Sequence, residues 1–124
     1  MTRLEGKQDA WVDDPALRQR LRFTRSGDEQ QVEIRVDPGG GVPPHVHPRI
    51  EERFEVLEGS PSILSGRRWQ TASPGDTVVV PPGTRHAYRN RESVPAHMIC
   101  HVAPPSSSLQ VFLEDAAALA RAGK

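Results

Sequence analysis

The sequence lacks the features that mark several common classes of protein. Its 124 residues include one cysteine, Cys100, so no disulfide can form within the chain and a reducing compartment is expected. Sixteen basic and sixteen acidic residues cancel, which leaves no net charge to attract nucleic acid or anionic lipid. No apolar run approaches the length of a membrane span, and the first fourteen residues contain no stretch typical of a secretory signal. We therefore expect a cytoplasmic protein without nucleic-acid or membrane partners.

Helical periodicity is also missing from most of the chain, which instead consists of short apolar segments between turns. Twelve prolines and ten glycines divide these segments, and the length is sufficient for one domain. The segment QVEIRV (31–36) alternates apolar and polar residues, the pattern of a half-buried strand. Further strands are expected in LRFTRSGDEQQ (21–31), ERFEVLEG (52–59), PSILSGRRWQT (61–71), DTVVVPPG (76–83) and AHMICHV (96–102). This pattern predicts an all-β sandwich or barrel.

The two ends of the chain differ from this β-rich centre. Near the C-terminus, apolar residues recur at helical spacing: Leu109, Phe112, Leu113, Ala116 and Ala120. Ser107 and Gln110 have the spacing of a capping box, so we predict one helix within 106–124, packed on a barrel formed by 17–105. Residues 1–16 show no clear element and are expected to form an arm.

A cluster of metal-binding residue types lies in the middle of the chain. His45 and His47 are two residues apart, so on a strand they point to the same side, and Glu52 follows across a bend. Two imidazoles and one carboxylate suit a divalent transition ion and leave coordination positions open. The alternative is that the two histidines only cap a turn between prolines.

Two stretches of the sequence place these residue types at fixed spacings. In the first, Gly39, His45, His47, Glu52 and Gly59 are separated by five, one, four and six residues. In the second, Gly75, Pro81, Gly83, His86 and Asn90 are separated by five, one, two and three residues. The two spacings resemble the two signature motifs of the cupin superfamily at every defining position.

This resemblance implies an all-β, cupin-type jelly-roll barrel, also called a double-stranded β-helix, with the short C-terminal helix packed on it. It also implies one divalent transition ion per chain, with four ligands: His45, His47, Glu52 and His86. On a six-coordinate ion, four protein ligands leave two positions for water, substrate or dioxygen, as in a catalytic site. Iron or manganese is favoured, and nickel, cobalt, copper and zinc remain possible, because affinity order alone does not select the ion.

The chain looks most like the small single-domain cupins described as quercetin-dioxygenase-like. For these, the resemblance implies an oxygenase that oxidises an enol or an aromatic diol, with Glu52 as the base. One alternative is an isomerase or cyclase that uses the ion as a Lewis acid without dioxygen. The other is a cupin that binds a small molecule without turnover. All three imply a small-molecule partner.

Several other side chains are candidates for the substrate pocket. Phe54 and Val56 share the strand parity of Glu52, and Tyr88 and Asn90 share that of His86. Val78 and Val80 alternate in the same way on the segment after Gly75. The valines and the phenylalanine equally suit the packed interior of a small barrel. Arginines around His86 are expected to be solvated charges at the rim.

The segment AHMICHV places His97 and His101 on one side of a strand and an apolar row on the other. The apolar row suits the core, so we predict that both histidines point outward and are not ligands. The opposite orientation would place an imidazole near the metal as a proton shuttle. We also expect a homodimer, because open sheet edges gain from being covered by a partner.

Overall fold

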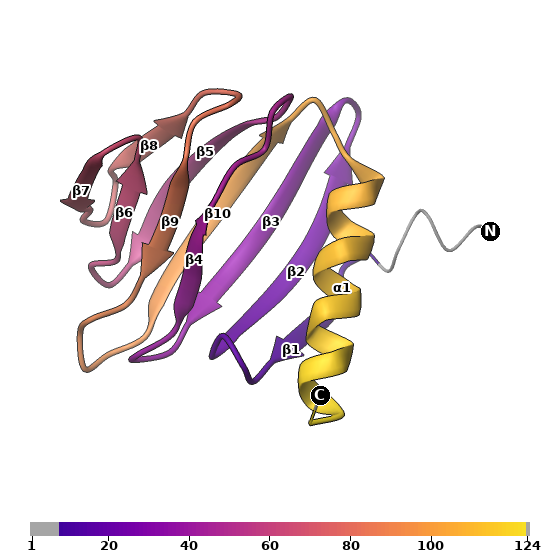
Figure 1. The fold of residues 1–124 in the computed structure, drawn as a ribbon, viewed down its shortest axis with the longest axis horizontal. Helices are drawn as coiled ribbons and strands as arrows, with labels where there is room; N and C mark the ends of the chain where they lie inside the picture. The colour runs from indigo at the N-terminus through magenta and orange to yellow at the C-terminus, as the bar shows by residue number, and fades with distance from the viewer. Residues whose placement is uncertain (1–7, 124) are drawn as a thin grey trace.

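The computed structural model describes residues 8–123, which form two antiparallel sheets facing each other, with one helix beside them (Figure 1). The strands are β1 (Trp11–Asp14), β2 (Gln19–Ser26), β3 (Glu29–Val36), β4 (Gly41–His45), β5 (Glu51–Glu58), β6 (Ser62–Ser65), β7 (Arg68–Thr71), β8 (Thr77–Val80), β9 (His86–Arg89) and β10 (Ala96–Ala103). The larger sheet has the order β1-β2-β3-β10-β5-β8, and the smaller has the order β4-β9-β6-β7. This arrangement confirms the predicted all-β jelly-roll class.

The core lies between the sheets and is filled by the alternating apolar residues of each strand. In β3, Val32, Ile34 and Val36 are buried, as the sequence pattern predicted. Phe54 of β5 and Met98 of β10 pack into the same cluster. Full burial of one such side chain contributes about 1.5–3 kcal/mol to stability. The two sheets are therefore held at a fixed separation, which fixes the positions of side chains at their inner faces.

The first strand corrects the expectation of an arm without an element in 1–16. Trp11–Asp14 form β1, which pairs with β2 in antiparallel register. Three arginine side chains, from Arg20, Arg22 and Arg35, approach the Trp11 ring at 5.1 to 5.9 Å from its centre. A four-residue strand is too short to show a period in the sequence. The part of the arm that spans residues 1–7 lies outside the described residues.

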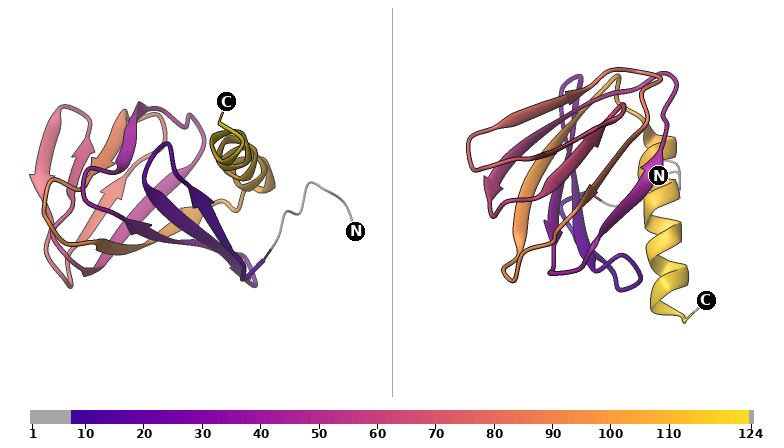
Figure 2. Two further views of the ribbon diagram at one scale, coloured as in Figure 1. Left: turned by 90° about the horizontal axis from the view of Figure 1, so that it is seen from below. Right: turned by 60° about the vertical axis from the view of Figure 1, so that its left-hand side comes forward.

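The helix α1 (Ser107–Arg121) lies beside β1 at one end of the larger sheet (Figure 2). Its N-cap is Ser106, whose Oγ accepts a hydrogen bond from the backbone N–H of Leu109 at 3.1 Å. The cap is therefore one residue earlier than the predicted Ser107, and no capping box forms there, because the residue three positions after Ser106 is Leu109. The backbone N–H of Ser106 donates to Gln30 Oε1 of β3 at 2.8 Å, a partner too distant in sequence for a local motif to reveal. Among the described residues, no helix is long and apolar enough to cross a membrane.

Candidate metal centre

The structure brings His45, His47, Glu52 and His86 together at one end of the space between the sheets. One potential ligand atom from each residue lies within 4.8 Å of those from the other three. His45 ends β4 and lies directly opposite His86, the first residue of β9, in the β4–β9 pair. Glu52 points inward from β5, and both it and His86 are buried. The four residues converge because the end of β4 and the start of β9, in one sheet, lie opposite the start of β5 in the other.

Backbone carbonyls fix the orientation of two of the rings. Nδ1 of His45 donates to the carbonyl of Pro43 at 2.8 Å, and Nδ1 of His86 donates to the carbonyl of Thr84 at 2.9 Å. In a neutral ring this leaves Nε2 without a proton and able to bind a metal. Sequence spacing could not reveal these contacts, because each acceptor depends on the local path of the chain.

The arrangement of Glu52 and His86 fits a bound cation. Nε2 of His86 lies 2.9 Å from Oε1 of Glu52, yet it is a buried nitrogen that makes no hydrogen bond of acceptable geometry. Nε2 of His47 lies 3.9 Å from the other carboxylate oxygen of Glu52. A buried polar atom without a partner is unfavourable. Three imidazoles and a carboxylate are the donor set of a divalent transition ion, so the residues fit such an ion.

The electrostatic environment differs among the three histidines. Burial lowers the pKa of both His45 and His47, so their rings are neutral at pH 7. Burial also opposes the charged form of His86, but the Glu52 carboxylate and the Thr84 carbonyl outweigh it, and its pKa is raised. A proton and a metal ion would therefore compete for the position between His86 and Glu52.

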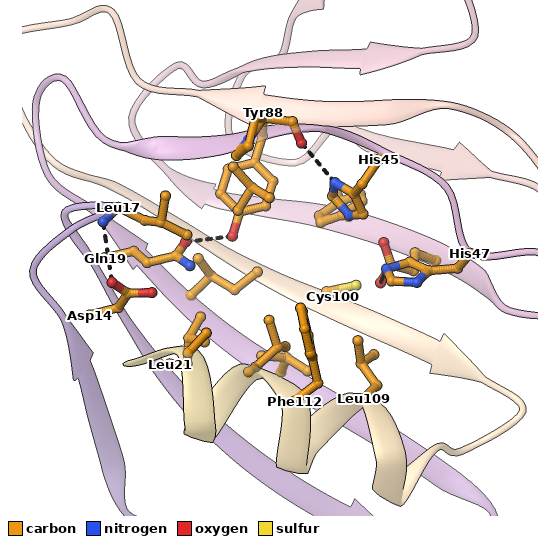
Figure 3. A pocket seen from close by; sticks show the side chains of 18 of the residues that line it. Asp14, Leu17, Gln19, Leu21, His45, His47, Tyr88, Cys100, Leu109 and Phe112 are labelled. Atoms are coloured by element: carbon orange, nitrogen blue, oxygen red, sulfur yellow. Dashed lines mark hydrogen bonds and ion pairs between the residues drawn. The ribbon is translucent and has the colours of Figure 1, made fainter. Parts of the chain in front are cut away.

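A cavity of about 450 Å³ opens onto this cluster (Figure 3). Its size lies within the range of about 300–1,000 Å³ that is typical of small-molecule sites. Most of its wall is apolar and comes from β2, β3, β4 and α1. Of the predicted pocket residues, Phe54 and Tyr88 line it, with ring centres 5.8 Å apart. The hydroxyl of Tyr88 donates to Gln19 Oε1 at 2.6 Å, and burial raises the pKa of this hydroxyl well above its ordinary value.

The remaining predicted pocket residues, Val56, Val78, Val80 and Asn90, are absent from the cavity wall. The three valines point inward but lie within the packed core. Asn90 is buried and holds a turn together: its Nδ2 donates to the carbonyls of Val36 and Val94, and its Oδ1 accepts from the backbone of Glu92. Strand parity predicted the inward direction correctly, but it does not tell how far along the interior the open space extends.

Sequence reasoning missed the part of the wall formed by β1, β2 and α1. Asp14 and Gln19 line the cavity, although neither belongs to a motif. The apolar stripe of the C-terminal helix was identified, but its role in the cavity was not: four of its five members line the cavity, namely Leu109, Phe112, Leu113 and Ala116. In the sequence, the signals that could have pointed to these cavity-lining residues were polar residues next to apolar strand positions and the apolar stripe of the helix.

The predicted outward orientation of His97 and His101 is confirmed. Nε2 of His97 lies 2.5 Å from a carboxylate oxygen of Glu33, and the two ring nitrogens of His101 lie 3.0 and 3.1 Å from Glu29 and Glu55. Neither histidine belongs to the ligand cluster. Cys100 lies on the opposite, inner face of β10 and borders the cavity. Burial raises the pKa of its thiol well above the ordinary value, so it remains protonated and is a poor metal ligand.

Comparison with known proteins decides the family. A family model described as a cupin domain matches residues 32–102. The chain belongs to the cupin family. Among curated cupin relatives, germin-like protein 5-1 of Oryza sativa subsp. japonica is 38% identical over 67 residues, which are 50% of this chain and 30% of that protein. Oxalate oxidase 1 of Hordeum vulgare is 36% identical over 75 residues, covering 52% of this chain and 37% of the relative.

Solved cupin structures agree with the fold. KdgF from Halomonas sp. superposes with a TM-score of 0.73 at 24% identity, covering 81% of this chain and 90% of that one. At this sequence identity, the similarity shows the shared fold alone. The chain spans only about a third of the length of the two plant relatives, as their coverage of 30% and 37% shows.

Proposed function

We propose that this cupin is a metal-dependent oxygenase that acts on a small, largely apolar substrate bearing an enol or phenol oxygen. The observation that carries the proposal is the apolar cavity of about 450 Å³ that ends at His45, His47, Glu52 and His86. A substrate in this cavity would present one end to the ligand cluster and bury the rest against apolar side chains. Burial of apolar surface would supply most of the binding free energy.

The charges around the cavity support this substrate class. Among the described residues, no lysine or arginine lines the cavity, and its two acidic residues are Asp14 and Glu52. A small dicarboxylate would find no side-chain cation there. Oxalate oxidase 1 of Hordeum vulgare is a relative whose name states its substrate. The apolar wall of this chain favours a larger and less charged molecule.

The protein's own residues would each contribute a defined step. His45, His47, Glu52 and His86 would hold the ion, which when bound supplies Lewis-acid and redox chemistry. The Glu52 carboxylate lies within the cluster and would accept the proton of the substrate hydroxyl. Phe54 and the helix side chain Leu109 would exclude water from the reacting end.

Oxygen uptake by the iron(II)- and manganese(II)-loaded protein tests this proposal against a panel of catechols and 1,3-diketones. We expect oxygen consumption that matches substrate loss, and a drop of about a hundredfold or more in Glu52→Gln at matched metal content, the scale of losing a general base. Turnover that persists under strict anaerobiosis would identify an isomerase or cyclase instead. Tight binding without any product would contradict an enzymatic function.

A further inference from the structure

The wall of the cavity carries two buried polar side chains on the side away from the histidines (Figure 3). Asp14 is the last residue of β1 and Gln19 the first residue of β2, and they lie directly opposite each other in the β1–β2 pair. Their exposed fractions are only 3% and 2%. Directly paired side chains on one face of a hairpin are close neighbours. The hairpin therefore presents two adjacent polar groups to the cavity, at the side away from the ligand cluster.

The two carboxylate oxygens of Asp14 have different surroundings. Oδ1 accepts hydrogen bonds from the backbone N–H groups of Ala16 and Leu17, at 3.1 and 3.2 Å, and so shapes the turn that follows β1. Oδ2 accepts no hydrogen bond from any residue that the structure describes. A carboxylate oxygen that faces apolar surroundings is stabilised by a hydrogen-bond donor. Oδ2 is therefore a strong acceptor available to a molecule in the cavity.

Gln19 supplies the complementary group. Its Oε1 accepts from the hydroxyl of Tyr88 at 2.6 Å, which fixes the orientation of the amide. Within residues 8–123, the Nε2 group of Gln19 has no hydrogen-bond acceptor, and no hydrogen bond links it to Asp14. The pair thus offers one free acceptor and one free donor side by side.

We propose that Asp14 and Gln19 form a second recognition point that binds a neutral hydroxyl group at the end of the substrate remote from the metal. A hydroxyl can donate to Asp14 Oδ2 and accept from Gln19 Nε2 at the same time. A carboxylate or phosphate would be repelled by Asp14, and an ammonium group cannot accept from the amide. The inference rests on the proposed function, because that function places the other end of the substrate at the ligand cluster. The substrate class is then a small molecule with a metal-binding oxygen, an apolar middle and a distal hydroxyl.

Three catechols that differ only at the far end test the pair. They are 4-ethylcatechol, 4-(2-hydroxyethyl)catechol and 3,4-dihydroxyphenylacetate, titrated calorimetrically into the zinc-loaded protein, since zinc has no redox chemistry. We expect the hydroxyethyl compound to bind about fivefold to tenfold more tightly than the ethyl compound, the scale of one net hydrogen bond. The carboxylate compound should bind more weakly than the ethyl compound. Equal affinities for the hydroxyethyl and ethyl compounds would overturn the proposal.

The variant Asp14→Asn isolates the charged acceptor. Asparagine keeps an oxygen for the turn but replaces the free carboxylate oxygen with a donor, so the penalty against the carboxylate compound should disappear. Asp13→Asn, at an exposed neighbouring position, is the matched control and should preserve the wild-type order of affinities. Urea unfolding verifies that both variants are folded. The titration of the three catechols into wild-type protein tests the proposal without any variant. If folded Asp14→Asn keeps the wild-type order, the assignment is overturned.

A further experiment on metal-free protein separates this inference from the proposed function. The side-chain amide signal of Gln19 is followed by NMR as 2-phenylethanol or ethylbenzene is added to metal-free protein. A larger shift with the alcohol supports the pair, and equal shifts or none overturn it. If no catechol binds the zinc-loaded protein while the alcohol shifts this signal, the proposed function fails and the second recognition point stands.

Discussion

At the scale of the residue, the partners of each imidazole separate the chain's histidines into two groups. Nδ1 of His45 and of His86 donates to a backbone carbonyl, which leaves Nε2 of each ring directed at the cluster. The ring nitrogens of His97 and His101 instead face carboxylates on neighbouring strands. The two histidines of AHMICHV share one face of their strand just as His45 and His47 do, so spacing alone cannot separate ligands from outward residues. The partner of the second nitrogen distinguishes them.

The ion pairs of Glu33 make stability depend on pH. Burial would raise the pKa of Glu33, but hydrogen bonds from His97 and Arg22 outweigh it, so the native pKa lies below the ordinary 4.5. A lowered native pKa means that this contribution is fully present above about pH 4.5 and is lost as pH falls through the native value. We expect Glu33→Gln to be less stable than wild type at pH 7, by up to about 1 kcal/mol because the pair is near the surface.

Urea unfolding at pH 7 and at pH 3 measures this difference. Glu92→Gln, at an exposed loop position, is the control and should change little at either pH. The difference in the free energy of unfolding between wild type and Glu33→Gln should be smaller at pH 3 than at pH 7. An equal difference at pH 7 and pH 3 would show that the charge of Glu33 does not contribute to stability.

At the scale of the element, the N-cap of α1 lies at a different residue from the one that the sequence pattern predicted. Ser106, not Ser107, accepts the hydrogen bond from Leu109, and its own backbone N–H is bound by Gln30. Ser106→Ala should therefore lower the free energy of unfolding by about 1 kcal/mol, the usual effect of losing an N-cap. Ser107→Ala is the matched control and should have a much smaller effect. Denaturant unfolding compares the two, and a larger loss for Ser107→Ala would contradict the cap.

At the scale of the whole molecule, the ligand cluster was predictable and the cavity was not. Strand parity predicts that His45 and His47 point to the same side, and the resemblance to the cupin motifs adds Glu52 and His86, because both signals come from short stretches of sequence. The cavity wall also needs Gln19 and Phe112, from β2 and α1, and their meeting depends on packing between segments that are distant in sequence. Local patterns carry no information about such packing.

The edges of the sheets lead us to propose a homodimer. Every residue of β7, at the edge of the smaller sheet, is exposed, and Trp69 lies there with the Arg89 guanidinium 3.9 Å from its ring centre. An unpaired strand edge can be covered by a second copy. Light scattering should give the mass of two chains, and Trp69→Ala should weaken the dimer more than Trp11→Ala does. The mass of one chain throughout the micromolar range would contradict the proposal.

The central claim is that His45, His47, Glu52 and His86 hold one divalent ion, and metal content tests it most directly. Wild type, His86→Ala and His97→Ala are loaded under identical conditions, freed of excess metal, and measured by elemental analysis per mole of folded chain. We predict about one ion per chain for wild type and for His97→Ala, whose ring faces Glu33 on the outer surface. We predict a large loss for His86→Ala, because it removes a buried ligand nitrogen. Wild-type metal content in His86→Ala would contradict the account.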